Sequence, residues 1–208
     1  MPDSLTEQRS LNVLILAAGL GTRMRSGLAK VLHEMDGRPL INHVCRTATA
    51  LAPETIYVVI GHQGEDVKAA VLNELDGQKV EFVTQEQQLG TGDAVNAARA
   101  YLQDTDSTLV VLSGDVPMIR PETLAALVQH HHRYLEQGAA CTILSVRLNE
   151  PTGYGRIVRD DSGSFDRIVE QKDATEDEKQ IAEINAGIYC FDSRKLYSAL
   201  SAVKNNNA

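Results

Sequence analysis

Short apolar runs rich in Val, Ile and Leu recur along the chain, and turn-forming residues bound each of them. They cover residues 12–16, 56–60, 80–84, 108–112 and 141–146. Short runs of this composition, bounded by turn residues, are typical of central strands of a mostly parallel sheet. We therefore expect these five segments to be central strands.

Between the runs, the apolar residues take helical spacing. This spacing predicts helices over residues 40–48, 67–75, 94–102 and 124–135. An alternation of strand and helix is typical of a doubly wound α/β fold, with helices on both faces of a mostly parallel, Rossmann-like sheet. In such folds ligands bind beyond the carboxyl ends of the strands, so the loops after strands are where we look for chemistry.

After Glu150 the pattern changes to short, charged, β-like pieces: GRIVRD, FDRIVEQKD and INAGIYCF. They predict a small antiparallel annex after residue 150, with the DDSG sequence at residues 160–163 forming a hairpin turn. The polar segment 1–10 is expected to be a disordered tail, and residues 11–208 to form one domain.

The charge balance excludes one class of partner. The chain carries 28 acidic and 20 basic residues, a formal net charge of −8. Such a surface repels polyanions, which argues against a nucleic-acid-binding protein. No run reaches the 18 or more apolar residues of a membrane span. Three scattered cysteines (Cys45, Cys141, Cys190) fit neither a disulfide framework nor a zinc site, so we expect buried thiols in a cytoplasmic protein.

The segment LAAGLGTRMRSGLAK, residues 16–30, follows the first apolar run and contains three glycines, three cations and no acid. Its backbone N–H groups can form an anion-binding nest, with Arg23 and Lys30 supplying charge. The Rossmann pattern fails because Met24 stands where the third glycine belongs, and the Walker pattern fails because Val31 follows Lys30. Either the loop binds a small phosphate, or it is a strand-to-helix turn with solvated cations.

The segment QEQQLGTGDA, residues 85–94, follows the third run. The Gln85 amide can pair with a pyrimidine edge, and Gly90 and Gly92 let main chain lie against a flat ring. The alternative is that Thr91 or Asp93 caps the following helix.

Asp115 comes just after the strongly apolar fourth run, in LVVLSGDVPMI. A carboxylate beside a bound triphosphate suits Mg²⁺, which prefers one or two carboxylates together with phosphate oxygens. The alternative is a plain turn former. The consecutive residues His130, His131 and His132 are not expected to chelate a metal, because neighbouring helical residues point about 100° apart.

The pattern G-x-G-T-R-M followed by a lysine resembles the signature of nucleotidyltransferases that join a nucleoside triphosphate to a sugar phosphate. QEQQLGTGDA, LSGDVP, PTGYGRI, VEQKDA and EINAGIY all resemble segments of the bacterial N-acetylglucosamine-1-phosphate uridyltransferases. That family usually has a proline before the lysine, where this chain has Ala29.

The resemblance implies a role for each matching residue. Arg23 and Lys30 would be catalytic contacts to the triphosphate, with Asp115 holding Mg²⁺. Three sugar-binding residues would be Gly155, Glu170 and Asn185, the last two as buried, paired side chains. The nucleotide-binding residues would be Leu16, Ala17, Ala18, Gly19, Gly21, Thr22, Gln85, Gln88, Gly90, Thr91, Ser113 and Gly114.

The resemblance further implies the nucleotide-diphospho-sugar transferase fold and the reaction of UTP with N-acetylglucosamine 1-phosphate. The product, UDP-N-acetylglucosamine, is a precursor of peptidoglycan and lipopolysaccharide. It also implies that the domain is truncated at its C-terminus, lacking a second metal-binding Asn and the acetyltransferase β-helix, and that the family protein is a homotrimer. The alternatives are a related enzyme with another sugar or base, and a nucleotide-sugar binding module without turnover.

Overall fold

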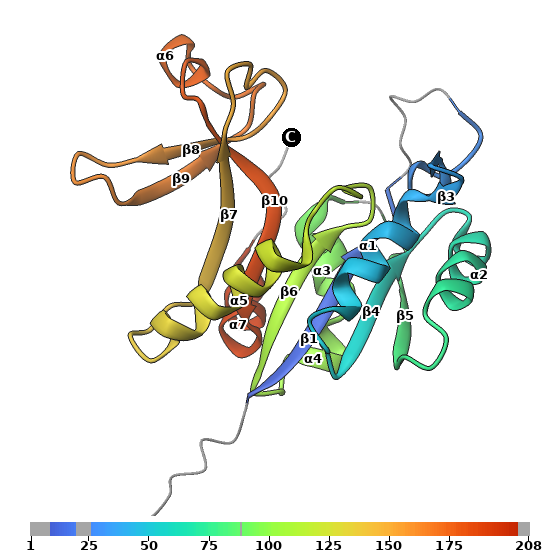
Figure 1. The fold of residues 1–208 in the computed structure, drawn as a ribbon. Coiled ribbons are helices and arrows are strands. Elements are labelled where there is room, and N and C mark those ends of the chain that lie inside the picture. Colours follow the sequence, from blue (N-terminus) through green and yellow to red (C-terminus); the bar gives the residue numbers. More distant parts are fainter. Residues whose placement is uncertain (1–8, 20–25, 88, 204–208) are drawn as a thin grey trace, which may run out of the picture. The chain divides into compact units, whose positions relative to one another are not determined.

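The computed structural model describes residues 9–19, 26–87 and 89–203 (Figure 1). The chain forms two compact units. The first comprises Met1–Thr142 with Cys190–Ala208, and the second comprises Ile143–Tyr189. The second unit covers the region in which the sequence predicts an annex. No helix of the described segments is long and apolar enough to cross a membrane.

A parallel sheet forms the centre of the first unit. Its strands follow the order β5-β4-β1-β6 and are β1 (Ser10–Leu16), β4 (Thr55–Ile60), β5 (Val80–Thr84) and β6 (Ser107–Ser113). Val13 of β1 pairs with Ile56 of β4 and with Val110 of β6, both in parallel register. The first four predicted strands are thus present, but β5 lies at the edge of the sheet and is not the central strand expected.

The apolar character of β1 and β4 follows from their burial on both faces. Val13, Leu14 and Ile15 are fully buried, and every residue of β4 is buried. Burying one such side chain contributes about 1.5–3 kcal/mol, so uninterrupted apolar runs are selected over alternating ones.

Helices cover both faces of this sheet (Figure 1). One face carries α1 (Leu40–Thr49), α2 (Gly64–Glu74) and α5 (Pro121–Leu135), and the other carries α3 (Thr91–Ala97), α4 (Arg99–Leu102) and α7 (Ser193–Ala202). The helix predicted over residues 94–102 is therefore divided into α3 and α4, because Ala98 leaves helical geometry with φ −83° and ψ 4°. The Tyr197 hydroxyl on α7 donates to the Val95 carbonyl on α3 at 3.2 Å.

A short connection after β1 was not predicted. It contains the 3₁₀ helix η2 (Lys30–Leu32) and the hairpin β2 (Glu34–Met35) with β3 (Arg38–Pro39). Asp36 and Gly37 turn this hairpin with φ of 52° and 68°, the left-handed values that a two-residue hairpin turn needs.

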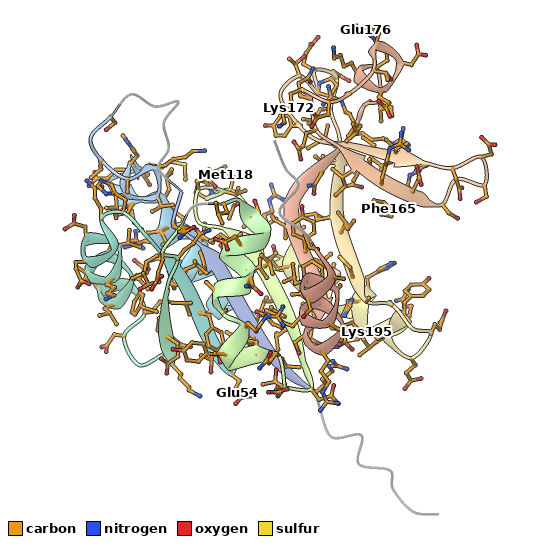
Figure 2. All side chains as sticks on the ribbon, turned by 180° about the vertical axis from the view of Figure 1, so that it is seen from behind. Glu54, Met118, Phe165, Lys172, Glu176 and Lys195 are labelled. Carbon is orange, nitrogen blue, oxygen red and sulfur yellow. The ribbon has the colours of Figure 1, made fainter. Side chains whose placement is uncertain are left out.

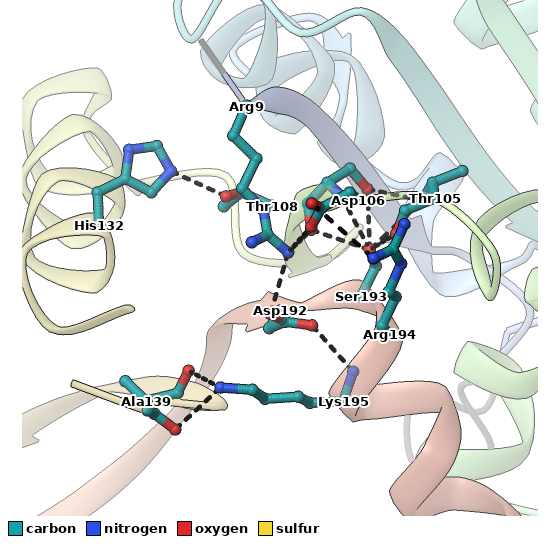
Figure 3. A network of polar contacts seen from close by, with 12 residues as sticks. Arg9, Thr105, Asp106, Thr108, His132, Ala139, Asp192, Ser193, Arg194 and Lys195 are labelled. Carbon is teal, nitrogen blue, oxygen red and sulfur yellow. Dashed lines mark hydrogen bonds and ion pairs between the residues drawn. The ribbon is translucent and has the colours of Figure 1, made fainter. Parts of the chain in front are cut away.

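A polar network fastens the amino ends of β1 and β6 to the start of α7 (Figure 3). The Arg9 guanidinium pairs with Asp106 at 2.9 Å and Asp192 at 3.0 Å, and donates to the Ser107 carbonyl at 3.1 Å. Ser193 donates to the carbonyls of Thr105 and Ser107. β1 begins at Ser10. Ser10 is thus part of a strand, and not of the disordered tail expected for residues 1–10.

The second unit contains the hairpin of β8 (Arg156–Arg159) and β9 (Phe165–Val169) and the short helix α6 (Glu176–Lys179). Its turn lies at residues 160–163 as predicted, with the Asp160 amide donating to the Ser164 carbonyl at 2.9 Å and Gly163 at φ 81°. Phe165, Lys172 and Glu176 mark the hairpin and the charged 172–179 segment in Figure 2.

Two strands, β7 (Cys141–Arg147) and β10 (Glu183–Asp192), each belong in part to both units. The prediction of β7 as a central strand is wrong: it pairs with β10 alone, and none of its residues is fully buried. Cys45 and Cys190 are buried as expected, and burial raises the pKa of the Cys45 thiol to about 12. Cys141 is exposed, because β7 lies outside the parallel core.

Candidate functional site

The loops that follow β1, β4, β5 and β6 leave the same edge of the first unit's sheet, because these four strands are parallel. Leu16, the last residue of β1, pairs in register with Ser113, the last residue of β6. The predicted nucleotide-binding segments 16–19, 85–91 and 113–115 therefore start at one edge of one sheet.

Close backbone contacts join the loops after β1 and β6. The Gly114 amide donates to the Leu16 carbonyl at 2.9 Å. A Cβ at Gly114 would come within 3.1 Å of that oxygen and of the Val31 Cγ1 atom, so any larger residue would crowd the two loops. Ala17 and Ala18 are buried, and the Ala17 backbone N–H donates to the Val59 carbonyl of β4 at 2.9 Å.

Lys30 and Asp115 are brought together at this edge. The Lys30 Nζ atom and the Asp115 carboxylate form an ion pair. Their side chains are 43% and 23% exposed, so both groups remain accessible to a ligand. The candidate triphosphate lysine and the candidate metal carboxylate, distant in sequence, thus share one location.

Asp115 offers a carboxylate oxygen, the kind of ligand that Mg²⁺ takes. Within the described ranges, no group of three or more His, Cys, Asp or Glu residues could enclose a metal. A single partly exposed carboxylate suits a hard cation that keeps its waters and takes phosphate oxygens from a substrate.

Gln85 organises the loop after β5. Its side chain is buried, and its Nε2 atom donates to the Asp93 Oδ2 atom at 2.8 Å and to the Gly90 carbonyl at 3.4 Å. Gly90 has φ 119° and ψ −178°, a conformation open to glycine alone. The capping alternative is wrong, because α3 begins at Thr91 with Gly90 as N-cap and no side chain caps it.

Four predicted residues, Gly21, Thr22, Arg23 and Gln88, lie outside the described residues. Gly19 lies within them and is exposed, and a Cβ added there would meet no heavy atom of the described residues within 4 Å. Thr91 is exposed at the start of α3.

The three predicted sugar residues lie together in the second unit. The backbone N–H of Asn185 donates to the Gly155 carbonyl at 2.9 Å. This bond lies next to the pairing of Ile184 with Arg156 between β10 and β8. A Cβ at Gly155 would come within 3.1 Å of the Glu170 Oε1 atom. Gly155 therefore allows the Glu170 carboxylate to lie directly against the turn.

The polar side chains of this cluster differ from expectation. Glu170 is exposed, and not buried as expected, because it follows the end of the two-stranded hairpin. Asn185 is partly buried, and its Nδ2 atom donates to the Tyr189 hydroxyl at 2.6 Å while its Oδ1 atom accepts from the Gly187 amide at 3.0 Å. Its amide orientation is thus fixed from both ends.

Sequence reasoning missed the residues that hold the turn at Gly155. Arg156 is 1% exposed and donates to the Tyr154 carbonyl and, at 2.8 Å, to the Gln171 Oε1 atom. The same oxygen accepts from the Gly153 amide at 3.0 Å. An arginine normally indicates surface, so only its place beside two turn glycines could have drawn attention to it.

An acidic group fixes β8 relative to β10. Glu183 accepts from Arg159 at 2.8 Å and from the Ser145 hydroxyl at 2.7 Å. These hydrogen bonds, with the positive charge of Arg159, lower the pKa of Glu183 to about 2. The carboxylate is therefore ionised, and the register that places Asn185 beside Gly155 is maintained.

The three consecutive histidines have three different environments on α5. His130 packs on the Tyr134 ring with 4.9 Å between centroids, and His132 hydrogen-bonds the Thr108 hydroxyl at 2.8 Å. His131 is fully buried, and its Nδ1 atom lies 3.0 Å from the Thr142 hydroxyl. Helical geometry separates the three rings.

Comparison with known proteins matches the chain to the MobA-like NTP transferase domain over residues 13–203. It is 48% identical over 198 residues to the Bifunctional protein GlmU of Brevibacillus brevis, covering 95% of this chain and 41% of that protein. It is 45% identical over 197 residues to the protein of the same name from Latilactobacillus sakei, with the same coverage of 95% and 41%. The chain thus spans less than half the length of these relatives.

Solved structures share the fold at lower identity. A UDP-glucose pyrophosphorylase complexed with UDP-glucose superposes with a TM-score of 0.76 at 18% identity, covering 94% of this chain and 80% of that one. The 4-diphosphocytidyl-2C-methyl-D-erythritol synthase of Anaerococcus prevotii superposes with a TM-score of 0.64 at 15% identity, covering 93% and 76%. Both similarities confirm the predicted α/β fold class.

Proposed function

Because the chain belongs to the MobA-like NTP transferase family, we propose that it transfers a uridylyl group from UTP to N-acetylglucosamine 1-phosphate. The products are UDP-N-acetylglucosamine and pyrophosphate. The observation that carries this proposal is the meeting of Lys30 and Asp115 at the carboxyl edge of the parallel sheet. A cation beside a carboxylate there provides both a phosphate contact and a metal ligand.

In the proposed reaction, an oxygen of the sugar phosphate attacks the α-phosphorus of UTP. A new oxygen–phosphorus bond forms while the bond from the α-phosphorus to the bridging oxygen breaks, and pyrophosphate takes the electron pair. The attacking oxygen is already anionic at neutral pH, so no strong general base is required. The main obstacle is repulsion between phosphates, and positioned positive charge reduces it.

Lys30 is proposed to contact the triphosphate with its ammonium group. Arg23, in the same segment 16–30 (the glycine loop), is proposed to contact it as well. In the ligand-free chain the Lys30 ammonium is held by Asp115. Lys30 must therefore turn from the carboxylate to the phosphates when the nucleotide binds. Asp115 would hold Mg²⁺, which when bound supplies further positive charge to the phosphate oxygens.

Recognition of uracil is proposed for the loop after β5. Gln85 already uses its Nε2 group to hold Asp93 and Gly90, so its contribution includes shaping the loop as well as contacting the base. The glycine conformation at residue 90 leaves main chain uncovered by a side chain, as stacking on a flat ring requires. Gln88 and Thr91 are proposed as further contacts in this loop.

Recognition of the sugar is proposed for Gly155, Glu170 and Asn185 of the second unit. The exposed Glu170 carboxylate can accept hydrogen bonds from sugar hydroxyls. The Asn185 side chain keeps one N–H and one lone pair beyond its bonds to Tyr189 and Gly187, and these can pair with the N-acetyl group.

We would test specificity by calorimetric titration with UDP-N-acetylglucosamine, UDP-glucose and dTDP-glucose in Mg²⁺ buffer. We expect UDP-N-acetylglucosamine to bind tightest and Asn185→Ala to weaken it by roughly tenfold, about the effect of one lost hydrogen bond. Asn73→Ala, on the exposed side of α2, is the matched control and should bind as the parent does.

Each alternative has its own result in this experiment. Tighter binding of dTDP-glucose would replace the proposal with a related sugar nucleotidyltransferase, and absence of binding would overturn the nucleotide-sugar assignment. Pyrophosphate release from UTP and N-acetylglucosamine 1-phosphate separates an enzyme from a binding module, which would retain affinity without turnover.

A further inference from the structure

The turn between β4 and α2 touches the glycine loop at two places. Gly61, the first residue of the turn, lies against Ala18 so closely that a Cβ at Gly61 would come within 3.1 Å of the Ala18 carbonyl oxygen. Gln63, the last residue of the turn, reaches the far end of the loop. Its Oε1 atom accepts from the Ala29 amide at 2.5 Å, and its Nε2 atom donates to the Gly27 carbonyl at 2.7 Å.

The backbone of Gln63 is in an unfavourable conformation for its residue type. It has φ 57° and ψ 31°, the left-handed region that glycine or asparagine adopts far more readily than glutamine. Gln63 is the N-cap of α2, yet its side chain makes no capping hydrogen bond. The side chain is used on the loop instead, and a non-glycine residue held in this region is reason to look for a functional cause.

The two hydrogen bonds fix the segment that directly precedes Lys30. A glutamine side chain ends in one acceptor oxygen and one donor nitrogen. It can therefore hydrogen-bond an N–H and a C=O of a neighbouring backbone segment at the same time. Ala29 is buried with φ −55° and is followed by Lys30, whose ammonium pairs with Asp115. The position of Gln63 therefore sets where the Lys30 backbone begins.

We propose that Gln63 is a positioning residue for nucleotide binding, which clamps Gly27 and Ala29 so that Lys30 is directed at the triphosphate. The inference deepens the proposed function and depends on it for the identity of the nucleotide. Gln63 acts through the loop and does not itself touch substrate. Its two hydrogen bonds hold the backbone at Gly27 and Ala29 in place. A proline at residue 29 would restrict the same backbone through its ring.

The test compares variants that separate positioning from folding. Gln63→Gly removes both hydrogen bonds but also relieves the left-handed backbone, so the two effects on stability oppose each other and the variant should remain folded. Ala52→Gly is the matched control: Ala52 also has positive φ, at 48°, and is exposed away from the loop. Ala52→Gly reports the effect of the backbone change alone, and it should melt at or above the parent temperature.

We expect Gln63→Gly to lower kcat/KM for UTP by about tenfold, below the roughly 10²-fold that a misplacement of about 1 Å can cost. The KM for N-acetylglucosamine 1-phosphate should stay within about twofold, because the lysine acts on the triphosphate. Ala29→Pro fits the observed φ of −55° and should restore most of the loss when added to Gln63→Gly. Ala52→Gly should keep the parent kinetics.

Unchanged kcat/KM for UTP in Gln63→Gly would overturn the inference, as would an equal loss in Ala52→Gly. The same variants titrated with UTP and Mg²⁺ distinguish this failure from failure of the proposed function. A parent that binds UTP without making UDP-N-acetylglucosamine removes the proposed reaction, and weaker UTP binding by Gln63→Gly alone would still support the clamp. If the parent does not bind UTP, both are overturned.

Discussion

The ion pair between Lys30 and Asp115 contributes little to folding. Lys30 is 43% exposed, and pairs of this kind typically contribute about 0–1 kcal/mol because solvent screens them. The proposed roles of the two groups in ligand binding therefore do not conflict with a structural role. Substitutions at either position should leave a folded protein.

We predict that Lys30→Met reduces turnover of UTP by a factor on the order of 10² to 10³, the usual effect of removing one preorganised charged group. Lys68→Met is the control, because Lys68 forms a comparable exposed pair with Glu65 at 2.7 Å on α2. Pyrophosphate release under saturating Mg²⁺ measures both. Turnover of Lys30→Met within twofold of the parent would remove Lys30 from the mechanism.

At the scale of the element, α5 carries a buried titratable group. His131 is fully buried and its surroundings offer the Thr142 hydroxyl as hydrogen-bond partner. Burial, together with the positive charges of His132 and Arg9, lowers the pKa of His131 to about 4 from an ordinary 6.5. The neutral ring is thus the form that α5 packs against the sheet.

This shift predicts a loss of stability in mild acid. Below about pH 6.5 the unfolded chain binds a proton at His131 that the folded chain does not bind until about pH 4. The free energy of unfolding should therefore fall as pH drops from 6.5 towards 4, by up to about 3 kcal/mol, with no contribution from this group above that range.

Urea denaturation at pH 7.5 and pH 5 would measure this effect. We expect His131→Gln, which keeps a polar side chain without titrating, to lose less stability between the two pH values than the parent. His130→Gln, on the exposed part of α5, should behave as the parent does. Equal losses in all three proteins would show that His131 does not cause the pH dependence.

At the scale of the whole chain, Arg9 connects segments from the two ends of the sequence. It joins the start of β1 to Asp106 before β6 and to Asp192 at the end of β10 (Figure 3). Asp192 is 10% exposed and also caps α7 by accepting from the Lys195 amide at 2.9 Å. Removing Arg9 would leave this nearly buried carboxylate without its cation.

We predict that Arg9→Met lowers the free energy of unfolding by about 1–3 kcal/mol, since breaking a largely buried pair leaves an uncompensated charge. The KM for UTP should not change. Arg9 lies before the amino end of β1, whereas Lys30 and Asp115 follow the carboxyl ends of β1 and β6, at the other edge of the sheet. Urea denaturation and steady-state kinetics on the same preparation would check this. A raised KM with unaltered stability would contradict the structural role given to Arg9.

The sequence alone determined the strands of the parallel core and the loops that follow them. Strands buried on both faces consist largely of consecutive apolar residues, as at residues 12–16 and 56–60, and this pattern can be read locally. It also determined the hairpin turn at residues 160–163, since turn chemistry is local. The edge position of β7 and the break between α3 and α4 were missed, because both depend on which neighbours a segment meets.

Only the tertiary structure decided which side chains meet. Lys30 pairs with Asp115, and Gln63 and Arg156 hydrogen-bond Ala29 and Gln171. No sequence pattern predicts these particular contacts. These contacts depend on the register of parallel strands and on turn geometry, so their partners become neighbours only when the chain is folded. Adjacency along the chain predicts elements, whereas the candidate site arises from adjacency in space.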